Sequence, residues 1–397
     1  MWRTRGKPNA RTAARFTNSK KANTSALATS VPYSVQAAAV EPALTVSAGR
    51  QRRLLGGAAA EGCNGGGSLV IAPQWIGDAV MTEPLLRRLH ARGERLTVGA
   101  LPWVAPVYRA MPQVAEVIEF PFAHGGLQFR ERRAIARQIE GRFDKAYVLP
   151  NSLKSALLPF LASIPERIGY FGEARVGLLT HRLKNPKNKP PMVAFYSALS
   201  GEAGIASDRP QLALNAGELA DTLTDLGLHS GGFYVFAPGA EFGPAKRWPA
   251  AHFAELAAQL QLPVVLLGSG KEAALCDAIA TPANLANPGH CLNFAGKTSL
   301  PQALALIAAS KATISNDSGL MHVAAALDVP QVAIFGSSSP LHTPPLSDKA
   351  RVLWLKTDPD YQPSLDCAPC YERDCPLGHT RCLNDISAAR VARLLAA

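Results

Sequence analysis

The chain has 397 residues, of which 47% are hydrophobic and 18% charged, and its formal net charge is +11. A chain of this length has more residues than a domain with a single hydrophobic core usually contains, so we expect two domains. Its composition is that of a water-soluble globular protein, and no run reaches the roughly 20 apolar residues of a transmembrane helix. These properties argue against an integral membrane protein.

Most of the excess positive charge lies in residues 1–67, which carry ten Lys/Arg and two Asp/Glu, or +8. The remaining 330 residues carry 31 Lys/Arg and 28 Asp/Glu, or +3, so we expect no nucleic-acid partner for the folded part. Residues 1–67 show no hydrophobic periodicity, and we predict a disordered basic tail there. An upstream start site or a species-specific tail is the favoured interpretation, and an organelle transit peptide is the alternative.

After this tail, short apolar strands alternate with helices, which predicts a parallel sheet covered on both faces. The predicted strands are Ser68–Ala72, Leu96–Leu101, Val117–Phe120 and Lys145–Leu149, and the helices are Gly77–Arg92, Phe129–Gly141 and Ser152–Ala162. A Pro/Lys/Asn cluster at Lys184–Pro191 indicates a loop or domain edge.

A second series of the same kind begins at Phe233. Its predicted strands are Phe233–Ala237, Val264–Gly268, Ala312–Ser315, Gln331–Phe335 and Val352–Leu355, and its helices are Ala250–Leu260, Lys271–Ala280, Leu300–Ser310 and Leu320–Leu327. The sequence therefore predicts an α/β protein with two doubly wound, Rossmann-like domains, residues 68–215 and 216–397, that face each other across a cleft. In such sheets, ligands bind beyond the carboxyl ends of the strands.

The stretch APQWIGDAVMTEPLLRRL, residues 72–89, places Asp78 near the start of a helix that follows a strand. An aspartate there commonly caps the helix by accepting hydrogen bonds from free backbone N–H groups. A carboxylate at a cleft can instead act as a general base that takes a proton from an attacking hydroxyl. The residues alone leave both interpretations open.

Two turns in the second half suit phosphate. In PGAEFGPAKRWP, residues 238–249, Gly239 frees the backbone and Lys246 supplies positive charge just ahead of a helix. In SNDSGLMH, residues 315–322, Asp317, Ser318, Gly319 and His322 surround a second helix start. Each turn also has an interpretation without a ligand. The first could be a basic surface loop, and in the second Asp317 could cap the helix while His322 makes only internal hydrogen bonds. Two anion-ready turns in one domain indicate a diphosphate, and therefore a nucleotide.

Four cysteines cluster within sixteen residues near the end of the chain: Cys367, Cys370, Cys375 and Cys382. Four thiols can hold zinc, but the two-plus-two spacing of a zinc finger is absent, so a cysteine-rich structural loop is the favoured interpretation. The acidic pair Asp358 and Asp360 is a weak match to a metal-binding DxD, because Asp-Pro-Asp is a common turn composition.

Together, PQWIGDAVMTEPLLRRL, PGAEFGPAKRWPAAHFAELA, NDSGLMHVAAAL and CAPCYERDCPLGHTRCLNDI closely resemble the lipopolysaccharide heptosyltransferases of glycosyltransferase family 9. The resemblance covers the chain from Ser68 onward. It implies a GT-B fold, an acceptor-binding first domain and a donor-binding second domain. It also implies inverting transfer of L-glycero-D-manno-heptose from ADP-heptose to the first heptose of the lipopolysaccharide inner core.

The resemblance further implies a role for each residue in these motifs. Asp78 would be the base, and Lys246 would contact the donor diphosphate. The donor site would also include the turn of Asp317, Ser318, Gly319 and His322. We place Gly239 in the donor site as well, because it lies in the same loop as Lys246. No metal cofactor is required by that scheme. The enzyme would be cytoplasmic and would meet its lipid-anchored acceptor peripherally at the inner leaflet of the inner membrane. The alternatives are another GT-B sugar-nucleotide enzyme, such as a different core heptosyltransferase or an epimerase, and a non-catalytic binding protein.

Overall fold

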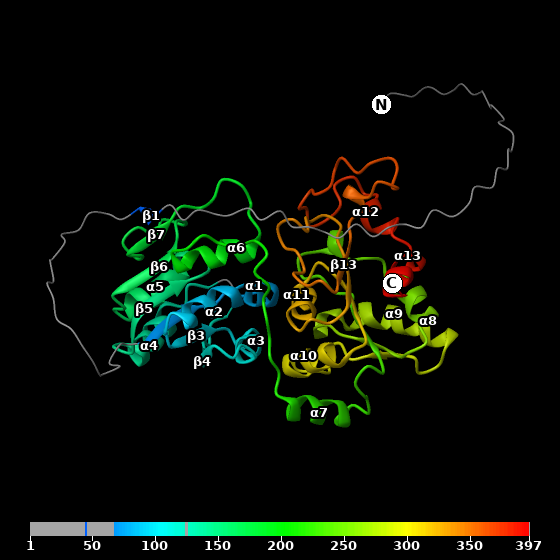
Figure 1. Ribbon diagram of the computed structural model, residues 1–397, viewed down its shortest axis with the longest axis horizontal. Helices are drawn as coiled ribbons and strands as arrows, with labels where there is room; N and C mark the ends of the chain where they lie inside the picture. The colour runs from blue at the N-terminus through cyan, green and yellow to red at the C-terminus, as the bar shows by residue number, and fades with distance from the viewer. Residues whose placement is uncertain (1–43, 46–66, 124–125, 397) are drawn as a thin grey trace, which may run out of the picture. The chain divides into compact units, whose positions relative to one another are not determined.

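The computed structural model describes residues 44–45, 67–123 and 126–396. These residues form two α/β lobes (Figure 1), as the alternation of strands and helices predicts. We call residues 67–200 the first lobe, residues 216–396 the second lobe, and residues 201–215 the connecting segment. The predicted disordered tail falls mostly outside the described residues.

The first lobe is built on a sheet with the strand order β1-β7-β6-β5-β2-β3-β4. Its parallel strands are β2 (Gly67–Ile71), β3 (Leu96–Ala100), β4 (Val114–Glu119), β5 (Phe143–Val148), β6 (Glu166–Tyr170) and β7 (His181–Leu183). The short strand β1 (Leu44–Thr45) adds to the edge of β7 in the antiparallel direction.

The second lobe repeats this order in a fully parallel sheet, β10-β9-β8-β11-β12-β13. Its strands are β8 (Tyr234–Ala237), β9 (Val264–Leu266), β10 (Cys291–Asn293), β11 (Thr313–Asn316), β12 (Gln331–Ile334) and β13 (Ala350–Leu353). In each lobe the winding reverses direction once, between β2 and β5 and between β8 and β11. These are the topological switch points, where loops diverge and leave room for a ligand.

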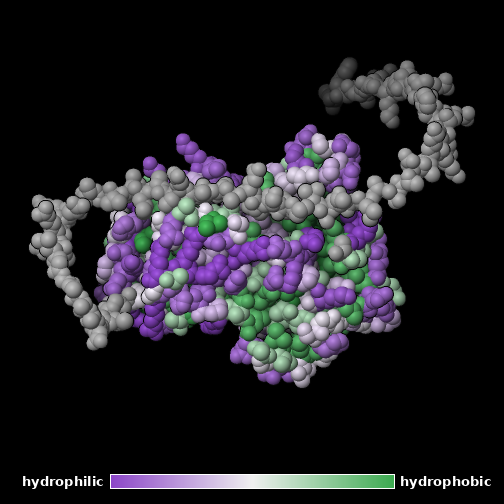
Figure 2. Space-filling model, in the orientation of Figure 1, coloured by the Kyte–Doolittle hydropathy of each residue, from purple (hydrophilic) through white to green (hydrophobic). Residues whose placement is uncertain are grey.

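Helices cover the sheets (Figure 1). Those of the first lobe are α1 (Ile76–Met81), α2 (Glu83–Ala91), α3 (Ala105–Arg109), α4 (Phe129–Ile139), α5 (Leu153–Leu161) and α6 (Met192–Ser197). Those of the second lobe are α7 (Ala216–Asp225), α8 (Ala250–Gln259), α9 (Ala273–Ala286), α10 (Leu300–Ala309), α11 (Gly319–Ala326), α12 (Arg381–Asn384) and α13 (Ala388–Ala396). On the face drawn in Figure 2, the first lobe is mostly hydrophilic, and hydrophobic residues gather over α10. None of the helices in the described residues is long and apolar enough to cross a membrane.

Two predicted helices differ from the structure near a proline. The helix predicted over Gly77–Arg92 is divided at Thr82 into α1 and α2, with Pro84 in the first turn of α2. Proline lacks an N–H and is tolerated in a first turn, so it favours a new helix start there. Conversely, α9 continues through Pro282 to Ala286, beyond its predicted end at Ala280.

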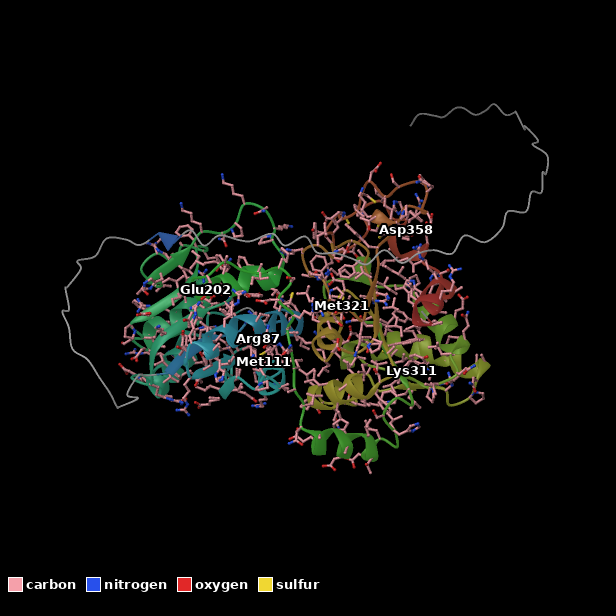
Figure 3. All side chains as sticks on the ribbon, in the orientation of Figure 1. Arg87, Met111, Glu202, Lys311, Met321 and Asp358 are labelled. Atoms are coloured by element: carbon pink, nitrogen blue, oxygen red, sulfur yellow. The ribbon has the colours of Figure 1, made fainter. Side chains whose placement is uncertain are left out.

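The two lobes touch through the starts of α1 and α11. A Cβ atom at Gly77 would lie 2.8 Å from Cδ2 of His322, and one at Gly319 would lie 2.8 Å from Cβ of Ile76. Only glycine therefore allows this approach. One apolar cluster continues from α1 and α3 of the first lobe into α10 and α11 of the second. Figure 3 labels Arg87 on α2 and Met321 on α11, in the two lobes that this contact joins.

Candidate functional site

Asp78 is the third residue of α1, directly after the switch-point strand β2. The cap position of this helix is Trp75, and no side-chain hydrogen bond caps it. The interpretation of Asp78 as the N-cap is therefore wrong, because α1 starts three residues earlier than a helix capped by Asp78 would start. The carboxylate lies in the first turn and is available for other chemistry.

Burial raises the pKa of Asp78 from 3.8 to about 6. The hydroxyl of Tyr196, on α6, donates a hydrogen bond to Oδ1 of Asp78 over 3.2 Å and opposes that rise. Asp317 raises the pKa of Asp78 further and Lys246 lowers it, so both second-lobe residues lie within its electrostatic reach. A carboxylate with a pKa near 6 is mostly ionised at pH 7 yet basic enough to accept a proton.

Lys246 and Asp317 form an ion pair at the second switch point. The Nζ atom of Lys246 lies 2.5 Å from Oδ2 of Asp317, which also accepts a hydrogen bond of 2.5 Å from Ser338. The side chains of Lys246 and Asp317 are 19% and 6% exposed. The lysine is thus held in place at the carboxyl ends of β8 and β11, where a diphosphate could compete for its charge.

Asn316 explains why the loop after β8 has its shape. Its Oδ1 atom accepts from the backbone N–H of Trp248 at 2.9 Å, and its Nδ2 atom donates to the carbonyl of Pro238 at 2.7 Å. Trp248 is buried and fixes the other end of the loop. The guanidinium of Arg247 folds back onto the carbonyl of Ala240. Of the two adjacent cations, only Lys246 is directed at the switch point.

The start of α11 has no side-chain cap, although Ser318 occupies the cap position. Its first backbone N–H groups therefore meet the requirement for an anion-binding helix start. His322 follows on the first turns of α11, and burial lowers its pKa to about 4. A neutral imidazole packed against Gly77 fits a role in the lobe contact.

Gly239 lies where the backbone after β8 passes the carboxylate of Glu272. A Cβ atom at this position would lie 1.7 Å from Oε1 of Glu272, so a larger residue would have to displace that carboxylate. Glu272 in turn accepts a hydrogen bond from the backbone of Ser269 and closes a capping box. The glycine therefore shapes the loop that carries Lys246.

A cavity of about 310 Å³ lies beside Tyr196. Residues from both lobes line it, among them Asn151, Asn185, Lys189 and His342. The Nδ1 atom of His342 lies 2.7 Å from the carbonyl oxygen of Pro190, which can only accept, so Nδ1 carries the proton. Burial lowers the pKa of His342, which leaves Nε2 as a hydrogen-bond acceptor. Amides, an ammonium and an imidazole suit a polyhydroxylated ligand such as a sugar.

Neither the cysteine cluster nor the acidic pair is arranged as a metal site in the described residues. In the described part of the chain, no three His, Cys, Asp or Glu side chains are placed to hold a metal ion. The zinc hypothesis for Cys367, Cys370, Cys375 and Cys382 therefore has no support here. Asp358, labelled in Figure 3, forms an ion pair with Arg390 on α13.

The structure brings Asp78, Lys246, Asp317, Ser318, Gly319 and His322 to one region where the lobes meet. Sequence reasoning missed Tyr196 and His342. Tyr196 sits in the apolar stretch MVAFYS, which reads as a core helix and gives no signal. His342 follows the donor-rich turn Gly336–Ser339, and its place after a predicted strand was the available signal.

Comparison with known proteins gives consistent matches. A family model described as glycosyltransferase family 9 (heptosyltransferase) matches residues 132–380. Lipopolysaccharide heptosyltransferase 2 of Escherichia coli K12 is 48% identical over 306 residues, which cover 73% of this chain and 88% of that protein. Lipooligosaccharide heptosyltransferase 2 of Haemophilus influenzae is 40% identical over 72% of this chain and 88% of that protein.

A solved structure agrees with the fold and the sequence matches. The structure titled E. coli ADP-heptose lps heptosyltransferase II has a TM-score of 0.71 and 42% sequence identity with this chain. The match covers 83% of this chain and 97% of the solved one. It confirms the prediction of two facing Rossmann-like domains in a GT-B arrangement.

Proposed function

Because the chain belongs to glycosyltransferase family 9 (heptosyltransferase), we propose that it transfers L-glycero-D-manno-heptose from ADP-heptose to the inner core of lipopolysaccharide. The acceptor is the first heptose of that core, and the anomeric carbon is inverted in a single displacement. The observation that carries the proposal is the position of Asp78, a buried carboxylate within electrostatic reach of the Lys246–Asp317 pair.

In this reaction Asp78 is the general base. It removes the proton from the attacking acceptor hydroxyl as the bond between the anomeric carbon and the diphosphate oxygen breaks. The proton ends on Asp78, whose pKa of about 6 lets it release that proton to solvent near neutral pH. The hydrogen bond from Tyr196, which lines the neighbouring cavity, holds one oxygen of the carboxylate in place.

The leaving diphosphate is stabilised by the second lobe. Lys246 provides positive charge, and the start of α11 at Ser318 and Gly319 provides backbone N–H donors. Asp317 holds Lys246 in place before the donor binds, and Gly239 keeps the loop close to the strand end. This scheme needs no metal ion. The first lobe accordingly binds the acceptor and the second lobe binds the donor.

The acceptor is anchored to lipid, so we propose that the enzyme works peripherally at the inner leaflet of the inner membrane. The mild excess of Lys and Arg in residues 68–397 favours approach to anionic lipid.

The decisive experiment incubates the protein with ADP-heptose and a core acceptor that carries one heptose, then measures the product mass. A gain of one heptose supports the proposal. An unchanged acceptor mass together with a sugar nucleotide of the same mass but different chromatographic retention would indicate an epimerase instead. No change in either substrate would favour a non-catalytic binding protein.

A further inference from the structure

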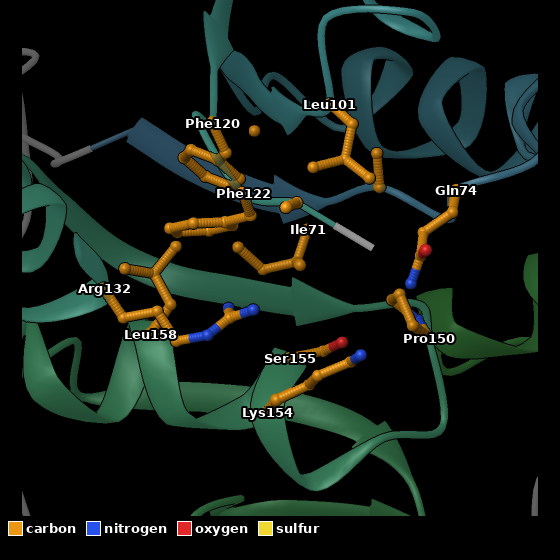
Figure 4. Close-up of a pocket in the computed structure, with 13 residues that line it drawn as sticks. Ile71, Gln74, Leu101, Phe120, Phe122, Arg132, Pro150, Lys154, Ser155 and Leu158 are labelled. Atoms are coloured by element: carbon orange, nitrogen blue, oxygen red, sulfur yellow. The ribbon is translucent and has the colours of Figure 1, made fainter. Parts of the chain in front are cut away.

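A second, smaller pocket opens at the carboxyl ends of β2, β3, β4 and β5 in the first lobe (Figure 4). Its volume is about 40 Å³, and its lining includes Arg132, Lys154 and Ser155 together with apolar side chains. Among the residues that the structure describes, no Asp or Glu side chain lines it. The reaction scheme above makes no use of these residues.

Arg132 is a buried cation without a counter-ion. The residue is only 6% exposed, and within residues 67–123 and 126–396 no ion pair involves its guanidinium. Its Nε atom donates to the carbonyl of Leu127 at 2.7 Å, and its guanidinium carbon lies 4.1 Å from the centre of the Phe122 ring. A buried charge is costly unless an opposite charge compensates it. Burial accordingly lowers the pKa of Arg132.

The opposite wall of the pocket is the start of α5. Figure 4 shows the guanidinium of Arg132 directed toward the side where Lys154 and Ser155 lie. Both of these residues belong to the first turn of α5, which has nine residues and no side-chain cap. The first N–H of the helix is already bound by Glu173, which does not line the pocket. Because Glu173 occupies the helix start, the positive potential of this small space comes from the two cations, Arg132 and Lys154, and it favours an anion.

The size of the pocket restricts the ligand to a single small group. A cavity needs about 10–15 Å³ by this measure for each water molecule, so about 40 Å³ holds a carboxylate or a phosphate group but no sugar ring. Pro150 lines both this pocket and the larger cavity beside Tyr196. A ligand whose sugar lies in the larger cavity can therefore place an adjacent anionic group here.

We infer that Arg132, Lys154 and Ser155 form an anion subsite that holds a carboxylate or phosphate group of the acceptor while its reacting heptose lies in the neighbouring cavity. The inference rests on the proposed function for the identity of the acceptor. Arg132 and Lys154 then determine which acceptors are used, because the enzyme selects substrates that present an anion at this distance from the attacking hydroxyl.

The test is a steady-state comparison of Arg132→Gln, Lys154→Gln and wild-type protein with the untreated core acceptor. Loss of a charge-assisted hydrogen bond typically weakens binding about 10- to 100-fold. We expect the acceptor KM to rise by that factor in Arg132→Gln and less in Lys154→Gln, with the KM for ADP-heptose unchanged. Arg133→Gln is the matched control, because Arg133 is an exposed residue of the same helix. If Arg132→Gln does not fold, the comparison of Lys154→Gln with Arg133→Gln carries the test, because Lys154 lies on a different helix.

Two modified acceptors identify the anion. If the group is a phosphate, the wild-type protein has a higher KM for the dephosphorylated acceptor than for the untreated one. Arg132→Gln then has the same KM for both acceptors. If the group is a carboxylate, an acceptor with esterified carboxylates raises the wild-type KM in the same way and leaves the KM of Arg132→Gln unchanged. Acceptor KM values for Arg132→Gln and Lys154→Gln that equal those of Arg133→Gln with every acceptor would overturn the inference.

A binding measurement separates this inference from the proposed function. Inorganic phosphate and acetate are titrated into full-length Lys246→Ala protein, which lacks the cation of the second-lobe turn. Saturable binding of either ion that Arg132→Gln abolishes supports the subsite even if no heptose transfer is observed. Binding that is the same with and without Arg132→Gln counts against it.

Discussion

Replacing Asp78 with asparagine should make the protein more stable while it destroys turnover. Burial holds the pKa of Asp78 at about 6 in the folded protein, against 3.8 for an unperturbed carboxyl. Below pH 3.8 the group is protonated in both states and has no effect. Between pH 3.8 and 6 the unfolded state loses the proton first, so stability falls as pH rises and stays lower above pH 6.

The shift is about two pKa units, and each unit corresponds to about 1.4 kcal/mol, so the ionised carboxylate costs about 3 kcal/mol. Asp78→Asn removes this cost. We expect its free energy of unfolding to exceed that of wild type by up to about 3 kcal/mol at pH 8 and by much less at pH 4. Turnover should fall about 10²- to 10⁴-fold, because general-base catalysis typically contributes that factor.

Urea titrations at several pH values between 4 and 8 measure the stability difference, and heptose transfer at pH 8 measures turnover. Glu131→Gln removes an exposed carboxyl of α4 and serves as the control for the loss of one negative charge. A stability difference that does not vary with pH would refute the account of Asp78 as a desolvated carboxylate. Turnover like that of wild type would remove it from the role of base.

Three further substitutions test the other parts of the site. Lys246→Ala should raise the KM for ADP-heptose about tenfold or more, whereas Lys271→Ala, whose side chain is 83% exposed, should leave it unchanged. Tyr196→Phe removes a hydrogen bond that lowers the pKa of Asp78, so the acid limb of the kcat/KM profile should move to higher pH; an unmoved limb contradicts this. Gly77→Ala should lower the free energy of unfolding and the activity, since its Cβ would lie 2.8 Å from the His322 ring, whereas Gly270→Ala meets no atom within 4 Å and serves as control.

The sequence predicts the sheets well because buried parallel strands are short, apolar and β-branched. The strand predicted over Ser68–Ala72 differs by one residue from β2 (Gly67–Ile71), and the strand over Phe233–Ala237 nearly coincides with β8. Strands β6, β7 and β10 were missed. Of these, β7 and β10 have only three residues each, which carry too little periodicity, and β6 (ERIGY) begins with two charged residues. The helix break before Pro84 was missed, and α9 was predicted to end at Ala280 although it continues to Ala286.

The sequence predicts those residues of the candidate site that belong to a motif directly after a predicted strand. Asp78, Lys246 and Asp317 stand at strand ends, so a parallel sheet alone suggests that they line a cleft. Tyr196 and Arg132 were not predictable, because each acquires its meaning from tertiary packing. Tyr196 reaches Asp78 across 118 residues of sequence. Arg132 belongs to the charged stretch FRERRAIARQI, whose composition predicts a solvent-exposed helix. Only the structure shows that Arg132 is buried.

The connecting segment sets how the lobes can move. The backbone N–H of Leu212 donates to Ala326 at the end of α11, and the N–H of the next residue, Ala213, donates to Ala110 just after α3. Two consecutive peptide units are thereby attached to opposite halves of the molecule. Any rotation that separates Gly77 from Gly319 without breaking either attachment must turn about this point. Leu212 and Ala213 are thus the point that stays fixed to both lobes as long as these two hydrogen bonds hold.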